Sequence, residues 1–268
     1  MKKYFVMSDI HSFYYEMMSA LEQKGFEYDN PDHIVIVCGD LFDRGDQAKQ
    51  CFRFVQEMFL QRRLVYIFGN HEGLLLECIG ELTSRGVVYN HHVQNKTIDT
   101  VAQLSGINRF DLQAGFFDRE QLEKAMKPFV DFMALALTDY FEKGDYVFCH
   151  AWVPCEESGL ITDNWRDGDW SQARWPNGMW MWYKGREYNT NFTKTIVCGH
   201  WHTSWGHCYL HRDGTEFPHQ NTKNWQKSFA PFVDEGIIAI DACTAYTGFC
   251  NCVVFDETDD GKLSLAAN

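Results

Sequence analysis

The stretch Gly39-Asp40-Leu41-Phe42-Asp43-Arg44-Gly45 decides the fold, because it follows directly on an apolar run, residues 34–38, and ends it with glycine and charged residues. Five other short apolar runs end in similar clusters of Gly, Asp, Asn or His: residues 4–7, 64–68, 146–149, 195–198 and 236–240. Runs of this length bounded by turn residues predict β-strands. The repetition predicts a sheet that presents polar residues at one edge.

The segments between the first three runs predict helices. In the first segment a helical period is carried by Phe13, Met17, Met18 and Leu21. We expect Ser12 to cap this helix and Gly25 to end it. The second segment repeats the pattern, so the chain opens with a βαβαβ unit whose crossovers are right-handed.

Two later segments break this alternation. Residues 84–145 are polar and then amphipathic, and we interpret them as a helical insertion or cap within a single domain that spans residues 1–268. Residues 152–205 resemble a loop and contain eight of the nine tryptophans. We expect these aromatic side chains mainly to cover the edge of the sheet, and some of them to line a groove where they stack on a nucleobase or grip a peptide.

Composition and charge exclude several classes of protein. The chain has 24 Lys and Arg against 37 Asp and Glu, a net charge of −13, which argues against an extended nucleic-acid track. It has no run of about 18 apolar residues, so we expect a cytoplasmic protein that does not insert into membranes. Several of the ten cysteines lie inside apolar runs, and we expect most of them to be reduced core residues.

The residues that follow the strands predict a metal centre, because parallel strands bring such residues to one edge of a sheet. Six of them are oxygen or nitrogen donors: Asp9, His11, Asp40, Asn70, His150 and His200. Six donors are too many for one four-coordinate zinc, whereas two metals that share a bridging carboxylate would use them all. We therefore expect two divalent metal ions, Mn²⁺ first, with iron and zinc as alternatives.

The motifs Asp9-Ile10-His11, Gly39 to Gly45 and Gly69-Asn70-His71-Glu72, with histidines after two later strands, resemble those of the calcineurin-like metallophosphoesterases. Within that superfamily the chain most resembles the phosphoprotein phosphatase branch, which includes the bacteriophage lambda type and the bacterial diadenosine tetraphosphatases. The resemblance covers residues 4–83 and 146–255. It implies an α/β fold of four layers, with a central β-sandwich flanked by helices.

The resemblance also implies how the metals are held. Asp9 and His11 would bind one metal, and Asp40 would bridge both. The ligands of the other metal would be Asn70, His150 and His200. The bound metals would generate a bridging hydroxide for in-line attack on phosphorus.

Four further residues receive roles from the same resemblance. His71 would be the general acid toward the leaving oxygen, and Asp43 would orient it. Arg44 would hold two phosphoryl oxygens with its planar guanidinium. A second arginine would assist it, and we expect Arg174, with Arg166 as the alternative.

Three positions depart from the family pattern. Ser8 and Ser12 replace glycines on either side of the Asp-x-His motif, so this turn can differ in backbone conformation. His202 is a second histidine that the protein phosphatase branch generally lacks but that the wider superfamily uses as a further metal ligand, so we include it as a candidate ligand. The sequence 241–243, Asp-Ala-Cys, replaces an Asp-Thr-Gly.

Three functions fit these observations, and the first is a metal-dependent phosphomonoesterase that acts on phosphorylated Ser or Thr, and on Tyr as a further substrate, in proteins or peptides. The second is hydrolysis of dinucleoside polyphosphates at the same centre. The third is a metal-binding scaffold without catalysis, which the presence of both His71 and Asp43 disfavours. A small phosphoester or a phosphorylated side chain is the expected partner of the site.

Overall fold

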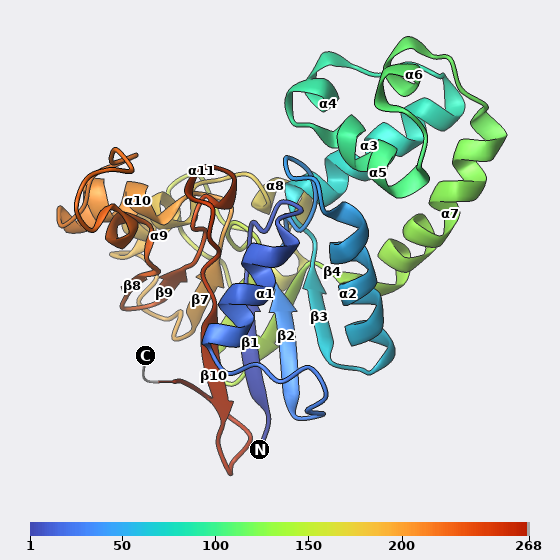
Figure 1. Ribbon diagram of the computed structural model, residues 1–268. Coiled ribbons are helices and arrows are strands. Elements are labelled where there is room, and N and C mark those ends of the chain that lie inside the picture. Colours follow the sequence, from blue (N-terminus) through green and yellow to red (C-terminus); the bar gives the residue numbers. More distant parts are fainter. Residues whose placement is uncertain (267–268) are drawn as a thin grey trace.

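Two β-sheets pack face to face in the computed structural model, which describes residues 1–266 (Figure 1). The first sheet has the strand order β11 (Leu263–Leu265), β10 (Val253–Glu257), β1 (Lys3–Met7), β2 (His33–Val37), β3 (Leu64–Ile67), β4 (Leu137–Thr138). The second has the order β5 (Tyr140–Lys143), β6 (Tyr146–Cys149), β7 (Thr195–Cys198), β9 (Ile237–Ala239), β8 (Phe232–Asp234). The six predicted runs are six of these strands.

The strands that carry the site run parallel within each sheet. In the first sheet, β1 pairs with β2 and β2 with β3, joined by the crossover helices α1 (Tyr14–Gln23) and α2 (Ala48–Leu60). In the second sheet, β6, β7 and β9 are parallel neighbours. In Figure 1 the arrows of β1, β2 and β3 point upward, so their carboxyl ends lie beneath the loops above the sheets. The predicted βαβαβ opening is confirmed.

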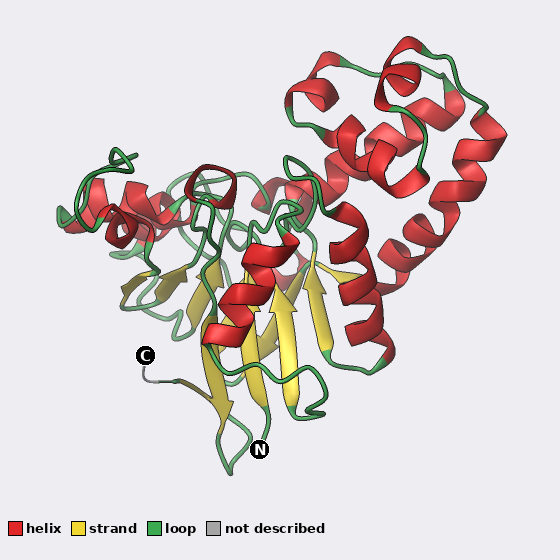
Figure 2. Ribbon diagram, in the orientation of Figure 1, coloured by secondary structure: helices red, strands yellow, loops and turns green. Residues whose placement is uncertain are grey.

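Apolar side chains divide the molecule into four layers of helix, sheet, sheet and helix. Val6, Ile36, Val197 and Ile238 belong to a core between the two sheets. A second core lies between the first sheet and the helices that cover its outer face, and α1 and α2 stand on that face in Figure 2. A third core, rich in tryptophan, covers the second sheet. The predicted sandwich flanked by helices is confirmed.

The remaining helices are α3 (Asn70–Ser84), α4 (Asn90–Gln94), α5 (Thr97–Ser105), α6 (Arg109–Ala114), α7 (Arg119–Ala136), α8 (Trp170–Ala173), α9 (Gly178–Gly185), α10 (Thr203–Gly206) and α11 (Thr244–Thr247). Short 3₁₀ turns occupy Trp165–Asp167 and Trp225–Phe229, and a π turn occupies His207–His211. The expectation of loop throughout 152–205 is thus wrong, because α8 and α9 lie there. Each begins after an Asp or Asn whose side chain accepts a hydrogen bond from backbone N–H groups of its first turn.

The helices α4 to α6, with the end of α3 and the start of α7, form a lobe that rises beside the carboxyl ends of the strands (Figure 1). The segment 84–145 is helical only to Ala136, after which β4 and β5 join the two sheets. The helix α7 returns from the lobe to the first sheet, where buried Phe129 makes edge contacts with Phe42 and Phe52 at centroid distances of 5.2 and 5.1 Å. No helix within residues 1–266 combines the length and apolar character that a bilayer span requires.

All ten cysteines are free thiols, and seven of them are buried. The buried thiols pack as small apolar side chains. No disulfide links the two sheets within the described chain, so apolar packing holds them together.

Phe129 provides a test of whether the lobe and the sheets unfold together. Replacing Phe129 with Ala should lower the free energy of unfolding by about 3–5 kcal/mol, because it empties a contact between α7 and the helices on the sheet. Urea unfolding should be followed by far-ultraviolet circular dichroism and by tryptophan fluorescence. All nine tryptophans lie between residues 152 and 225, so fluorescence reports on the sheets while dichroism includes the lobe.

The control is Leu135→Ala on the same helix, where the side chain is 75% exposed and the expected change is within about 0.5 kcal/mol. Coincident transitions in the wild type would agree with a single domain. Two separate transitions would show that the lobe folds on its own.

Candidate metal centre

Asp40 lies at the centre of the predicted site and belongs to two groups of metal-type donors. In one group its carboxylate lies with His11 and His71, and in the other with His150 and His200, with donor atoms within 4.8 Å of one another in each. Asn70 joins the second group, because its Oδ1 is 2.8 Å from Nε2 of His150. The structure thus brings together residues from the ends of β1, β2, β3, β6 and β7.

Three imidazoles are held so that one nitrogen faces this centre. Nδ1 of His11 donates to the Phe42 carbonyl at 2.9 Å, and Nδ1 of His150 donates to the Cys38 carbonyl at 2.9 Å. His200 is turned the other way, with Nε2 donating to the Trp175 carbonyl at 2.9 Å. Each bond leaves the opposite nitrogen without a proton and directed inward, as metal-binding histidines require.

The pKa values separate these three histidines from His71. Burial lowers the pKa of His11, His150 and His200, that of His200 to about 4, so all three are neutral at physiological pH. Burial also acts to lower the pKa of His71, but the charges of Asp40 and Asp43 and the hydrogen bond that His71 donates to Asp43 outweigh it and leave that pKa raised. Three imidazoles are therefore suited to coordinate a metal, and the fourth to carry a proton.

Buried carboxylates make the centre strongly attractive to cations. Burial raises the pKa of Asp9, and the nearby charges of Asp241 and Asp40 raise it further. Burial also raises the pKa of Asp241 to about 7. Burial acts in the same direction on Asp40, but the surrounding imidazoles outweigh it and lower its pKa. Carboxylates this close to one another, together with neutral imidazoles, fit divalent cations.

Two glycines make room for the donors. A Cβ atom at Gly69 would lie 2.3 Å from Oδ1 of Asp40, and one at Gly199 would lie 2.2 Å from Oδ2 of Asp9. Such approaches are impossible for any residue with a side chain, so glycine is required where the backbone passes the carboxylates. The cradle fits a metal centre, because it holds ligand oxygens against backbone.

The turns of the site store backbone strain. Seven residues other than glycine have left-handed φ angles between 52° and 73°: Asp9, His11, Ser12, Asp40, Asp43, Arg44 and His200. This conformation costs about 1–2 kcal/mol for such residues. Ser12, with a φ of 61°, thus adopts a conformation that glycine reaches without this cost. The expectation that Ser12 caps α1 is wrong, because its buried hydroxyl has no hydrogen-bond partner and Phe13 stands at the helix start.

His71 and Asp43 form a dyad that the lobe supports. Nδ1 of His71 donates to Oδ2 of Asp43 at 2.7 Å. The hydroxyls of Thr97 and Thr100, both on α5, donate to Oδ2 and Oδ1 of the same carboxylate at 2.9 Å each. The backbone N–H of Asp43 in turn donates to the Thr100 hydroxyl at 3.1 Å. Sequence reasoning missed both threonines, because no motif connects residues 97–100 to Asp43.

Glu72, the last residue of the Gly-Asn-His-Glu motif, is not one of the metal-type donors, and its carboxylate is hydrogen-bonded mainly to backbone N–H groups. Its carboxylate accepts hydrogen bonds from the N–H groups of Asp40, Leu41 and Gly69, at 2.8 to 2.9 Å, and from the Tyr66 hydroxyl at 2.8 Å. It therefore fixes the turn after β2 to the start of α3. The Gly-Asn-His-Glu spacing signals this role, because Glu at the third position of a helix reaches back to its start.

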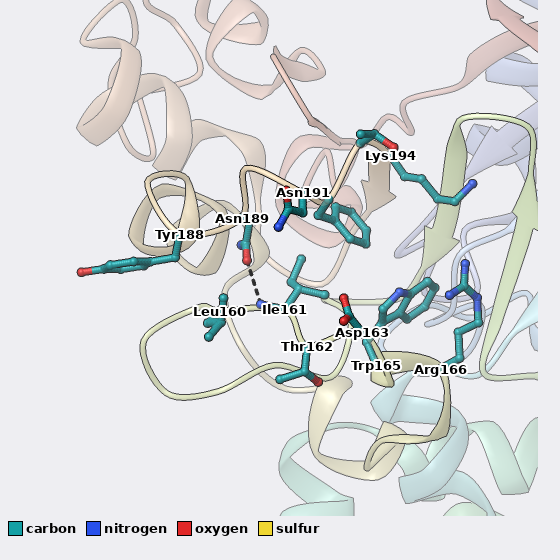
Figure 3. Close-up of a pocket in the computed structure, with 12 residues that line it drawn as sticks. Leu160, Ile161, Thr162, Asp163, Trp165, Arg166, Tyr188, Asn189, Asn191 and Lys194 are labelled. Atoms are coloured by element: carbon teal, nitrogen blue, oxygen red, sulfur yellow. Dashed lines mark hydrogen bonds between the residues drawn. The ribbon is translucent and has the colours of Figure 1, made fainter.

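The two arginine candidates for the second phosphate contact lie in different places. Arg174 stacks on Phe68, with its guanidinium carbon 3.7 Å from the ring centroid, and donates to Asp139 at 2.6 Å. Its charge acts on His150, and its Nε is buried without a partner. Arg166 instead pairs with Glu142 and lines a separate pocket, shown in Figure 3, that shares no described residue with the Asp40 centre.

Arg44 lies beside His71, with its Nη2 donating to Nε2 of that residue at 3.2 Å. The two arginines that reach the centre, Arg44 and Arg174, thus lie near His71 and His150 respectively.

His202 lies outside both donor groups. Its Nδ1 is 2.8 Å from the Ser204 hydroxyl, and its Nε2 is 3.6 Å from Oε1 of Glu216. The ring packs against Phe217 at a centroid distance of 4.4 Å. The chain turns into α10 directly after His202, which carries the imidazole away from His200.

The class of protein follows from a family comparison. The model of the calcineurin-like phosphoesterases matches residues 2–230, so the chain belongs to this family. It is therefore a metal-dependent phosphoester hydrolase, and its family implies a centre of two divalent metals.

The relatives include two bacterial proteins named bis(5′-nucleosyl)-tetraphosphatase PrpE [asymmetrical]. The protein from Bacillus subtilis (strain 168) is 25% identical over 186 residues, 65% of this chain and 69% of that protein. The protein from Bacillus velezensis is 25% identical over 162 residues, 58% of this chain, and the match spans 59% of that protein, less than two thirds of its length.

Two solved structures share the fold. A cold-active protein tyrosine phosphatase aligns with a TM-score of 0.54 at 17% identity, over 99% of this chain and 78% of that one. A Saccharomyces cerevisiae protein serine/threonine phosphatase, similar to human PP5, aligns with a TM-score of 0.52 at 14% identity, over 99% of this chain and 79% of that one.

Thr100 provides a test of the support that the lobe gives to the dyad. The isosteric change Thr100→Val removes a hydrogen bond to buried Asp43 and leaves the Asp43 N–H without an acceptor. We expect the free energy of unfolding to fall by about 1–3 kcal/mol, and turnover to fall with it, because Asp43 loses its orientation. The control is Thr83→Val, since the Thr83 hydroxyl bonds only to carbonyls of its own helix. Equal turnover in both variants would argue against this role.

Proposed function

We propose that this hydrolase cleaves dinucleoside polyphosphates, such as diadenosine tetraphosphate, by attack of water on phosphorus at the Asp40 centre. Two exposed indoles beside the centre carry the proposal. The rings of Trp175 and Trp201 lie 6.4 and 6.2 Å from that of His200, and the two residues are 51% and 38% exposed. Such a surface offers stacking to a nucleobase while the phosphate chain reaches the donors. The names of the PrpE relatives support the same substrate class.

The residues of the chain divide the work of hydrolysis. Two divalent cations at the Asp40 donors would polarise the phosphoryl oxygens and lower the pKa of the attacking water. Arg44 and Arg174 would bind phosphoryl oxygens with their guanidinium N–H groups. His71 would hold the transferable proton on Nε2, because its Nδ1 faces Asp43, once Arg44, whose Nη2 lies 3.2 Å from Nε2, has turned to the phosphoryl oxygens. That proton would pass to the leaving oxygen.

A phosphoprotein phosphatase is the second candidate. His200 is only partly buried and both indoles are exposed, so the centre opens onto the surface. A phosphorylated Ser or Thr side chain could reach it from there. The acidic net charge disfavours neither substrate, since the arginines and the bound cations would make this edge locally positive.

The substrates can be separated by direct comparison. With Mn²⁺ present, kcat/KM should be higher for diadenosine tetraphosphate than for a phosphoserine peptide. Trp175→Ala should raise KM for the dinucleotide roughly tenfold, because stacking of a base on an aromatic ring contributes ~1–3 kcal/mol. Its KM for para-nitrophenyl phosphate should not change.

The matched control is Trp180→Ala, since this indole is 44% exposed but packs on Tyr183 and Trp205. Turnover of the peptide alone would reject the dinucleotide proposal and favour the second candidate.

His71→Asn tests the proton donor. Turnover of a phosphoserine peptide should fall by about 10²–10⁴-fold, since its alkoxide leaving group needs a proton. The loss should be smaller for diadenosine tetraphosphate, whose nucleotide leaving group is a weaker base. Metal content should be unchanged, and this measurement matters because the His71 ring lies in one of the donor groups. Loss of bound metal would instead identify His71 as a ligand.

A further inference from the structure

A second set of metal-type donors lies between α3 and α4, apart from the Asp40 centre. Glu77 and Glu81 are one helical turn apart on α3, and His91 and His92 are adjacent on α4. One ligand atom each from Glu77, His91 and His92 lie within 4.8 Å of one another. We propose that Glu77, His91 and His92 form a structural zinc site that ties α4 to α3, with Glu81, whose Oε2 lies 3.3 Å from Nε2 of His92, as a further carboxylate beside it.

His92 is the residue that calls for a ligand. Its side chain is 0% exposed, yet neither Nδ1 nor Nε2 has a hydrogen-bond partner. Nε2 lies 3.3 Å from Oε2 of Glu81, but the pair does not have hydrogen-bond geometry, and that oxygen is also buried without a partner. Buried polar atoms are nearly always paired, so unpaired atoms of opposite character facing each other need an explanation. A cation between them supplies one.

The distances suit a small cation held by Glu77, His91 and His92, which Glu81 would reach as a fourth ligand once its side chain turns toward it. Oε2 of Glu77 is 3.8 Å from Nε2 of His91, and the centroids of the two imidazoles are 3.9 Å apart. Ligand atoms at about 2.0–2.2 Å from a tetrahedral zinc lie roughly 3.4 Å from one another. Small side-chain movements would therefore close the site. Two imidazoles and two carboxylates are a donor set that zinc accepts well.

A buried ion pair between His92 and Glu81 is the competing explanation, and the geometry opposes it. The two groups lack hydrogen-bond geometry, and a charged imidazolium would also leave the N–H at Nδ1 buried without an acceptor. A neutral imidazole is the form that coordinates metal.

The position of the site gives it a structural consequence. The helix α4 leads directly into α5, whose Thr97 and Thr100 hold Asp43. A cation that fixes α4 to α3 would steady α3, which carries His71 at its start, and α5, whose threonines hold Asp43.

Metal counting on the full chain tests the proposal. After chelation and re-equilibration with zinc, the wild type should bind three ions per chain, two at the Asp40 centre and one here. Glu77→Gln and His91→Gln should each bind two, with affinity for the third ion weakened by at least about tenfold. Both side chains are about half exposed, at 51% and 44%, so the variants should fold.

The matched control is His211→Gln in a second His and Asp group, where His207 and His211 are already bonded to Asp213 and Asp234. This variant should keep three ions. A wild type that binds only two, or loss of the third ion in His211→Gln instead, would overturn the proposal. The result is independent of the proposed substrate, because hydrolysis is measured on the same samples and needs only the Asp40 centre.

Discussion

The rest of the structure depends on one buried carboxylate surrounded by imidazoles. Asp40 lies 3.4 Å from Nε2 of His150 and 4.0 Å from Nε2 of both His11 and His71, and its Oδ1 accepts the His71 backbone N–H at 2.9 Å. These partners come from both sheets and from α3. Because an unpaired buried charge is very costly, every segment that supplies a partner is constrained to end at this point. The parallel strands satisfy that constraint together.

Glu72 transmits the constraint to the backbone. Its four hydrogen bonds connect the turn that carries Asp40 to the start of the helix that carries His71. Burial and the charge of Asp40 raise the pKa of Glu72 to about 7. A further carboxylate so close to Asp40 costs electrostatic free energy. The three backbone N–H groups that it accepts offset that cost, and a neutral side chain would bind them less strongly. The strained φ angles of Asp40 and Asp43 persist because this network holds them.

The sequence predicts the strands and the grouping of the donors at their ends, because both follow a local pattern in the chain: an apolar run, then a turn residue, then a donor. It does not predict contacts between segments that are far apart in the sequence. Thr97 and Thr100 lie more than 50 residues from Asp43 and carry no motif of their own. Serine is a residue type that often caps helices, but the turn at Ser12 has a left-handed backbone conformation. His202 follows His200 by two residues, yet it stands at the start of α10, and its ring nitrogens lie near Ser204 and Glu216.

The helical lobe carries no family motif, yet its helix α5 contacts the candidate centre through Asp43. His71, the proposed proton donor, keeps a raised pKa although burial opposes it. That requires a charged Asp43 held in place, and the two hydroxyls of α5 stabilise its charge in a site with 0% exposure. The lobe is itself fixed to the sheet by Phe129 and to α3 by the packing of α4. Packing far from the proposed metal donors therefore contributes, through Asp43, to the raised pKa of His71, alongside the charge of Asp40.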